Sequence, residues 1–416
     1  MKSLLKSGLV LLLLQTAGVH ATTTVTNIAA GFFHSLFLKS DGSLWAMGRN
    51  DSGQLGDGTF NGTNRPEQIV SSDIIAVAGG GYGYSDGGPF ISEGHTLFIK
   101  SDGSLWAMGY NSPGQLGDGT FNTTNKPEQI VSSGVVAIAA GEIHSLFLKS
   151  DGSLWAMGLN NYGQLGDGKY YIKTNQPEQI VSNGVTAITG GGFHSLFLKS
   201  DGSLWAMGNH QFGQLGDGTA GTSYPYGTNR PEQIVSNGVV AIAGGYAHSL
   251  FLKSDGSLWG MGANGYDQLG DGTFNDANRP EEIVSSGVVA IAGGGGHSLF
   301  LKSDGSLWAM GYNAYGPLGD GFTNRTSSLP EQIVPSPQPL LTVNTSSNTN
   351  LQFTATCQFG GTFYLLTSTN LMQPLSQWTP VRTNSVKARG TNNFNVTLTN
   401  AVSLSIGQQF YILQSQ

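Results

Sequence analysis

The sequence contains six copies of one unit of about 50 residues, and this repetition limits the possible folds more than any other feature. The stretch "KSDGSLWAMG" begins at Lys39 and returns in each later unit, with one letter changed in one copy. A unit of this size cannot bury its own apolar faces, so the copies must stack on one another. We therefore expect a propeller or a solenoid. The tryptophans that mark the register are Trp45, Trp106, Trp155, Trp205, Trp259 and Trp308.

Each unit predicts four short strands. It reads, in order, a small-residue run such as "VVAIAAG", then "HSLFLK", an Asp-Gly pair between serines, "LWAMG", a polar Gly-rich stretch and "PEQIV". Asp41 and Gly42 between two apolar runs predict a hairpin with a type I′ turn. Pro66 is expected to begin the fourth strand, where a missing amide costs no ladder hydrogen bond. The small residues of the first strand are expected where the sheets crowd toward a common axis.

The composition supports an all-β fold. Glycine occurs 62 times, charged residues make up only 11% of the chain, and no helical periodicity is visible. The predicted architecture is a β-propeller of six four-stranded blades over residues 22–334. Closure of the ring by a borrowed terminal strand, or by a seventh blade, stays open at this point.

The ends of the chain differ from the repeats. Residues 1–21 combine a basic start, an apolar centre and a small-residue exit, which predicts a removed signal peptide and a secreted or cell-surface protein. Residues 335–339, "PSPQP", predict a stiff linker. Residues 340–416 predict a small β-rich domain that resembles a sandwich. Cys357 is the single cysteine, so no internal disulfide can form.

The charge balance limits the partners. The net charge is -7 and basic residues do not cluster, so we expect no nucleic-acid partner. After the signal peptide no second long apolar run appears, so we expect no membrane span. We expect a monomer without a cofactor.

The signatures "HSLFLKSDGSLWAMG" and "GQLGDGT" recur over residues 28–334 and resemble the repeat of the regulator of chromosome condensation family, here in a secreted bacterial form. The resemblance implies a protein-binding β-propeller, although familiar members commonly have seven blades. Relatives include nucleotide exchange factors for small GTPases that also dock on chromatin. They also include secreted bacterial proteins that inhibit β-lactamases. The resemblance does not select either partner.

The units differ mainly in two connections, the one after the first strand and the one after the third. Because strands in a meander alternate in direction, both connections are expected on the same face of the ring. Aromatic residues are enriched there, beside glycine, serine and asparagine, which is typical of binding surfaces. Free drift of unconstrained loops is the alternative. The predicted binding residues are Phe32, Phe33, Tyr82, Tyr84, Tyr110, Tyr162, Phe193, Phe212, Tyr246, Tyr266, Tyr312 and Tyr315.

The repeated polar residues suggest no chemistry. Histidines such as His34 precede a serine, but neighbours on a strand point to opposite faces and cannot share a proton. A structural histidine bonded to the backbone is favoured over a metal ring. Asp57 and its equivalents in "GQLGDGT" are interpreted as turn formers rather than calcium ligands. We expect no catalytic or metal-binding residue.

The leading functional hypothesis is a secreted, non-enzymatic propeller that binds a protein or glycan through one aromatic-rich face. Three alternatives stay open. The first is an inhibitor of an extracellular β-lactam or cell-wall enzyme, and the second is a regulator of the guanine nucleotide exchange type. The third is a hydrolase or lyase with its site in the axial funnel, which would need non-repeated polar residues there.

Overall fold

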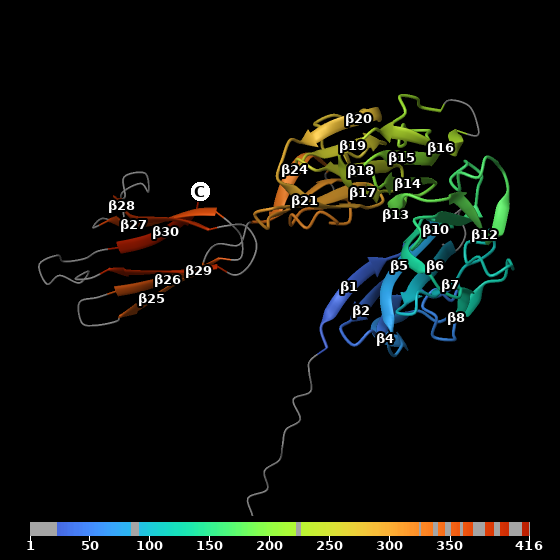
Figure 1. Cartoon of the computed structure of the whole chain (residues 1–416), viewed down its shortest axis with the longest axis horizontal. Helices are drawn as coiled ribbons and strands as arrows, with labels where there is room; N and C mark the ends of the chain where they lie inside the picture. Colours follow the sequence, from blue (N-terminus) through green and yellow to red (C-terminus); the bar gives the residue numbers. More distant parts are fainter. Residues whose placement is uncertain are drawn as a thin grey trace, which may run out of the picture.

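The computed structural model describes residues 23–84, 91–221, 226–323 and 326–335, and six strands between residues 340 and 415. The predicted signal peptide 1–21 lies outside the described residues, as does the linker 335–339 except for its first residue. Six four-stranded antiparallel sheets follow one another along the chain (Figure 1). The structure confirms the all-β propeller of six four-stranded blades.

The strands are assigned to blades in chain order. Blades 1 and 2 comprise β1 (Val25–Ala30), β2 (His34–Lys39), β3 (Leu44–Gly48), β4 (Thr63–Val70), β5 (Ile74–Tyr84), β6 (Ile91–Lys100), β7 (Leu105–Gly109) and β8 (Thr124–Val131). Blades 3 and 4 comprise β9 (Val135–Ala140), β10 (His144–Lys149), β11 (Leu154–Leu159), β12 (Lys173–Val181), β13 (Val185–Gly190), β14 (His194–Lys199), β15 (Leu204–Asn209) and β16 (Gly227–Val235). Blades 5 and 6 comprise β17 (Val239–Gly244), β18 (His248–Lys253), β19 (Leu258–Gly262), β20 (Ala277–Val284), β21 (Val288–Gly293), β22 (His297–Lys302), β23 (Leu307–Gly311) and β24 (Ser327–Val334).

The predicted Asp-Gly hairpin forms, but its turn type was predicted wrongly. Gly42 has a φ of +78°, whereas Asp41 is not among the residues with positive φ. The amide of Gly42 donates to the carbonyl of Lys39 at 2.9 Å, and the amide of Lys39 donates to the carbonyl of Ser43 at 3.1 Å. This is a turn with a left-handed glycine after it, not a type I′ turn. The Asp41 carboxylate accepts from the amide of Ser43 at 3.0 Å, which holds Asp41 in an ordinary conformation.

The position predicted for Pro66 was also wrong. The outer strand β4 begins at Thr63, so the proline lies inside the strand rather than at its start. The pairing of β3 with β4 shifts register between Ala46, opposite Glu67, and Gly48, opposite Thr63. Proline is tolerated here because β4 is the edge strand of its sheet and the ladder is interrupted at this point.

Neighbouring blades share their cores. The leucines of one blade pack against a phenylalanine and a methionine of the next, as Leu146 and Leu148 of blade 3 do with Phe197 and Met207 of blade 4. Phe197 is fully buried, and it also stacks on Trp205 of its own blade with ring centroids 6.0 Å apart. Burial of such a phenylalanine contributes about 2 to 3 kcal/mol, so each of the five joints between consecutive blades contributes substantially to the stability.

The innermost strands contain small residues because they meet at the axis. A Cβ added at Gly190 would lie 2.7 Å from the amide nitrogen of Gly141 in the preceding blade. A Cβ at Gly244 would lie 2.7 Å from the carbonyl oxygen of Gly190. No larger residue fits at such distances, so the backbones of adjacent blades can approach closely only with glycine at these positions.

The joint between blade 6 and blade 1 lacks this packing. Phe37, the equivalent of Phe197, is only half-buried, and Ile28 on β1 is 77% exposed. At the other end Leu301 is 37% exposed, whereas its equivalent Leu252 is buried. In the described part of the chain the sheet of blade 1 contains only β1 to β4, so it borrows no terminal strand. The ring is therefore open between blade 6 and blade 1 (Figure 1), and we call this gap the unsealed joint.

The described strands beyond the propeller form two three-stranded antiparallel sheets. The first has the order β25 (Leu340–Thr345), β26 (Leu351–Cys357) and β29 (Asn392–Leu398). The second has the order β28 (Thr379–Val386), β27 (Gly361–Ser368) and β30 (Phe410–Ser415). Two small sheets of this kind agree with the β-rich character expected from the sequence.

Candidate functional site

Five of the six repeated histidines bond to a serine or threonine hydroxyl of the next blade. His144 Nε2 lies 3.0 Å from Ser195 Oγ, and the same pairing links five successive joints. The expectation of a backbone partner for these histidines was wrong, because the sequence cannot show which residues meet across a joint. At the unsealed joint, no bond of this kind joins His297 to Ser35 among the described residues. The five pairs are His34 with Thr96, His95 with Ser145, His144 with Ser195, His194 with Ser249, and His248 with Ser298.

The hydrogen bonds fix the tautomer of these rings. Ser195 Oγ donates its proton to the carbonyl of Gln164 at 2.8 Å, so His144 Nε2 must be the donor to Ser195. His144 Nδ1 is then an unprotonated acceptor, buried and without a partner. Burial lowers the pKa of His144 to about 4. Both side chains are fully buried, so the pair is structural and no substrate can reach it.

The repeated aspartates form turns. Asn50 Nδ2 donates to Asp57 Oδ1 at 3.0 Å, and the amide of Thr59 donates to the same oxygen at 2.8 Å. Asn50 Oδ1 accepts from the amide of Leu55 at 2.9 Å, which closes the loop between β3 and β4. The carboxylate is thus engaged in holding its own loop, as the turn-former interpretation expected.

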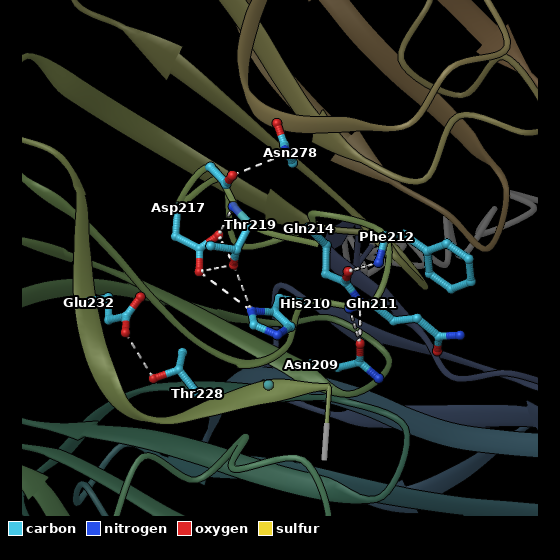
Figure 2. A network of polar contacts seen from close by, with 12 residues as sticks. Asn209, His210, Gln211, Phe212, Gln214, Asp217, Thr219, Thr228, Glu232 and Asn278 are labelled. Atoms are coloured by element: carbon cyan, nitrogen blue, oxygen red, sulfur yellow. Dashed lines mark hydrogen bonds and ion pairs between the residues drawn. The ribbon is translucent and has the colours of Figure 1, made fainter. Parts of the chain in front are cut away.

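Blade 4 builds this loop differently, because His210 occupies the position of the asparagine. Figure 2 shows His210 directed toward Asp217 and Thr219, with His210 Nδ1 3.5 Å from Asp217 Oδ2 and 3.1 Å from Thr219 Oγ1. The neighbouring Asn209 makes different bonds, because its Oδ1 accepts from Gln214 Nε2 at 3.1 Å and from the amide of Gln211 at 2.7 Å. Although burial favours the neutral acid, hydrogen bonds from His210 and Thr219 lower the pKa of Asp217.

The two faces of the ring carry different connections. The amide of Ile74, after the β4–β5 link, donates to the carbonyl of Gly42 in the hairpin turn, so these two connections share one face. On the opposite face the amide of Arg49 donates to the carbonyl of Phe33, which joins the β1–β2 connection to the end of β3. We call this second face the loop face. It is made by the β1–β2 and β3–β4 connections of blade 1 and their equivalents.

Most of the predicted aromatic residues on the loop face are in contact across blades. Phe193 contacts three of them, with ring centroids 5.2 Å from Tyr162, 6.3 Å from Tyr246 and 6.4 Å from Tyr82. We call these four residues the blade-4 aromatic cluster. Their rings come from blades 2, 3, 4 and 5, so the cluster spans several joints.

A second group, the blade-6 aromatic cluster, comprises Tyr266, Tyr312 and Tyr315. The ring centroids of Tyr266 and Tyr312 are 4.9 Å apart, and those of Tyr312 and Tyr315 are 6.3 Å apart. Tyr315 is 89% exposed and Tyr266 54% exposed, so neither covers the core.

The other predicted residues lie apart from these clusters. Phe32 and Phe33 form an edge-to-face pair at 4.6 Å beside the unsealed joint. Tyr110 hydrogen-bonds to the carboxylate of Glu93, and Phe212 is half-buried in the loop of Figure 2. Tyr84 ends β5, and nothing is described of its side chain. The strands β5 and β6 are longer than their equivalents in the other blades, because the second unit has additional residues between its first and second strands.

A cavity of about 510 Å³ lies where the innermost strands meet. Its wall is mostly glycine and alanine from all six blades, with Phe32, Tyr246, His297 and Glu142 as the larger side chains. Glu142 was missed by the sequence interpretation, although a carboxylate lies two residues before the repeated histidine only here and at Glu93, whereas the other units have glycine, phenylalanine or tyrosine there. It is only 6% exposed, and burial raises its pKa to about 8.

The strand order, the shared cores and the bonded joints define a β-propeller protein. The model of the RCC1-like domain matches residues 90–412, and the model of the regulator of chromosome condensation (RCC1) repeat matches residues 25–54 and 41–83. The chain belongs to the RCC1-like domain family.

Individual relatives match over shorter lengths. Human protein RCC2 is 36% identical over 121 residues, which are 28% of this chain and 21% of that protein. The human E3 ubiquitin-protein ligase HERC2 is 29% identical over 111 residues, 26% of this chain and 2% of that protein. The chain therefore spans only a small part of the length of these relatives.

Solved structures show the same fold. Yeast RCC1 (Prp20), solved bound to Kap60, has a TM-score of 0.65 at 22% identity over 75% of each chain. Human WBSCR16 has a TM-score of 0.63 at 24% identity, over 77% of this chain and 84% of that one. At these identities the likeness shows the fold alone. In the described residues no helix is long and apolar enough to cross a membrane.

Proposed function

We propose that this protein is an exported, monomeric propeller without enzymatic activity, whose loop face binds a protein or glycan partner. The observation that carries the proposal is the pair of aromatic clusters on that face. Exposed tyrosines such as Tyr266 and Tyr315 offer large contact area at low cost in conformational entropy. Solvent-exposed aromatic groups that touch across blades form a continuous patch on a rigid scaffold.

The alternative of loop drift accounts less well for these contacts. Drift would scatter aromatic residues without regard to their neighbours in space. Tyr266 and Tyr312 come from different blades, yet their rings are 4.9 Å apart. Aromatic residues that covered the edge of the core would be buried, but Tyr315 is 89% exposed.

The comparisons support protein binding more than they support any particular partner. Yeast RCC1 was solved bound to Kap60, and that binding is a property of the yeast protein. A nucleotide exchange role or inhibition of a cell-wall enzyme would extend relatives' activities to a chain that spans about a fifth of RCC2. For export, the support is the composition of residues 1–21.

The proposal is tested by capture from the culture medium of the source organism. Wild-type protein is compared with a variant carrying Tyr266→Ala, Tyr312→Ala and Tyr315→Ala. The control variant carries Ser40→Ala and Ser101→Ala, at hairpin turns on the opposite face. We expect the control to retain the partner and the tyrosine variant to lose it. Equal capture by both variants would contradict the assignment of the face, and a reporter fused to residues 1–25 that stays in the cell would contradict export.

One observation favours a second candidate, a hydrolase or lyase. Glu142 lines the axial cavity, and burial raises its pKa to about 8, as a general acid requires. Across the described wall the other titratable side chains are Tyr246 and His297. Turnover in a panel of glycan and ester substrates, lost in Glu142→Gln, would favour this candidate over binding alone.

A further inference from the structure

The carboxyl group of Glu142 is buried at the wall of the axial cavity without a counter-charge. Among the described residues its Oε2 atom has no hydrogen-bond partner, and the residue is only 6% exposed. Burying an ionised carboxylate without a partner is costly, and the cost is relieved when a cation or donor enters the site. The packing of the fold alone therefore does not explain a carboxyl group at this position.

The backbone holds the site in place. The amide of Glu142 donates to the carbonyl of Gly192 in the next blade at 3.3 Å. The amide of Tyr246 donates to the carbonyl of Gly294 at 3.1 Å, and the amide of Gly192 donates to the carbonyl of Tyr246 at 3.0 Å. These bonds link four blades around the cavity, so the position of the carboxyl and the nearby ring is set before any ligand arrives.

Aromatic rings adjoin the carboxyl. Tyr246 lines the same cavity as Glu142. Its ring contacts that of Phe193, which in turn contacts the rings of Tyr162 and Tyr82. Burial, together with the negative charge of Glu142, raises the pKa of Tyr246 to about 12, so the two groups are electrostatically close and the phenol stays neutral. Ring faces attract ammonium groups, and Tyr is among the rings that do so.

We propose that Glu142 and the blade-4 aromatic cluster bind an alkylammonium group at the loop-face mouth of the axial cavity. The chemistry is that of a lysine side chain, its N-methylated forms, or a small quaternary amine. The wall of glycine and alanine leaves a cavity of about 510 Å³, which accommodates such a group. Rings supply attraction to a diffuse positive charge, and the carboxylate supplies the counter-charge.

Other ligand classes fit less well. At pH values above 8, where Glu142 is ionised, an anion would face its negative charge. A metal ion needs several ligands, and among the described residues no group of three or more His, Cys, Asp or Glu side chains could hold one. The inference rests on the proposed function in one respect, because a partner protein is one source of the ammonium group.

Binding is expected to depend on pH. Only ionised Glu142 attracts a cation, and at a pKa of about 8 the ionised fraction rises roughly 30-fold between pH 6.5 and pH 9. The titratable groups around it are His144, His194, His297 and the tyrosines of the cluster. The histidine pKa values lie below the ordinary 6.5 because of burial, and tyrosines titrate near or above 10. Glu142 is thus the group that changes charge in this range.

The test measures binding of choline to the full-length protein by calorimetry at pH 6.5 and pH 9. Choline keeps its charge over this range, and 3,3-dimethylbutan-1-ol is its neutral isostere. We expect choline to bind at least ten times more tightly than the isostere at pH 9, and more weakly at pH 6.5. Glu142→Gln should remove the pH dependence and lower the affinity tenfold or more. Tyr246→Ala should weaken binding, while the control Phe274→Ala, at an exposed ring outside both aromatic clusters, leaves it unchanged.

Several results would overturn the inference. These are equal binding of choline by Glu142→Gln, equal binding of the neutral isostere, or binding neither of choline nor of a peptide with one trimethyl-lysine. Binding of the peptide alone would support the site and assign the ammonium group to a partner protein. Thermal unfolding of each variant establishes that it is folded.

The two proposals can fail separately. Choline binding that depends on Glu142, in a protein that captures no partner, would leave the ammonium site standing and contradict the proposed function. Capture of a partner that depends on Tyr266, Tyr312 and Tyr315 but not on Glu142, without choline binding, would support the proposed function and contradict the ammonium site.

Discussion

His144 Nε2 and Ser195 Oγ lie 3.0 Å apart across the joint between blades 3 and 4, and both side chains are fully buried. The serine passes its own proton to the carbonyl of Gln164, so one hydroxyl satisfies two buried groups from the preceding blade. The same arrangement recurs at four other joints, which makes it the polar counterpart of the shared apolar core.

The first prediction concerns this hydroxyl. Ser195→Ala leaves His144 Nε2 and the carbonyl of Gln164 without a partner, and each unsatisfied buried group costs about 1 to 3 kcal/mol. We expect the free energy of unfolding, measured with denaturant, to fall by a comparable amount. Ser35→Ala is the matched control, because Ser35 is the equivalent residue on the free face of blade 1 and is exposed. Equal losses in both variants would mean that the interblade bond does not contribute.

The second prediction is loss of stability in acid. Burial lowers the pKa of the five interblade histidines from 6.5 to about 3 or 4, so below pH 6.5 the unfolded chain binds protons that the folded chain does not. Their contribution is complete above pH 6.5 and is lost as pH falls toward 4, at about 1.4 kcal/mol per pH unit for each ring. The midpoint of thermal unfolding should therefore drop steeply between pH 6.5 and pH 4. A midpoint that stays constant over this range would show that the rings titrate normally.

The third prediction has the opposite sign. The pKa of Glu142 rises from 4.5 to about 8 on folding, so the folded chain holds a proton that the unfolded chain releases, and stability falls as pH rises from 4.5 to 8. Glu142→Gln removes this loss. We expect the variant and the wild type to unfold at similar temperatures at pH 5, and the variant to be more stable by about 1 to 4 kcal/mol at pH 8. A variant less stable at pH 8 would indicate that the carboxylate has a partner in solution.

The fourth prediction concerns the unsealed joint. Phe197 and Phe37 each stack on the tryptophan of their own blade, at 6.0 and 6.1 Å, but only Phe197 is also covered by the preceding blade. Phe197→Ala is expected to cost about 3 to 5 kcal/mol, as for a fully buried ring. Phe37→Ala should cost less than half as much. Comparable losses in denaturant unfolding would mean that blade 1 is covered in solution.

Much of the fold follows from the repeat. The recurrence of "HSLFLKSDGSLWAMG" and the small residues of the first strand predicted blades, hairpins and crowding at the axis, and the structure confirms these features. The turn type at Asp41 was wrong because an Asp-Gly pair is compatible with more than one turn. The residue types in a turn do not alone determine its dihedral angles. Here the hydrogen bond from the amide of Ser43 to the carboxylate of Asp41 also contributes.

Less of the candidate functional site could be predicted from the sequence. The interblade pairs were missed because their members, such as His144 and Ser195, are separated by a whole repeat and meet only when the blades stack. Glu142 was missed because the sequence does not show whether a loop carboxylate is buried. The signal that could have found it is a carboxylate two residues before the repeated histidine, which only two of the six units have.

The unsealed joint bears on how such a chain can change in length. Units 2 to 5 each carry a histidine that bonds to the following unit and a hydroxyl that bonds to the preceding unit, and among the described residues no bond of this kind joins unit 6 to unit 1. Duplication or deletion of a whole unit in the gene would preserve both complementary ends. Proteins built from such units can therefore differ in the number of units while every joint keeps the same kind of interblade hydrogen bond.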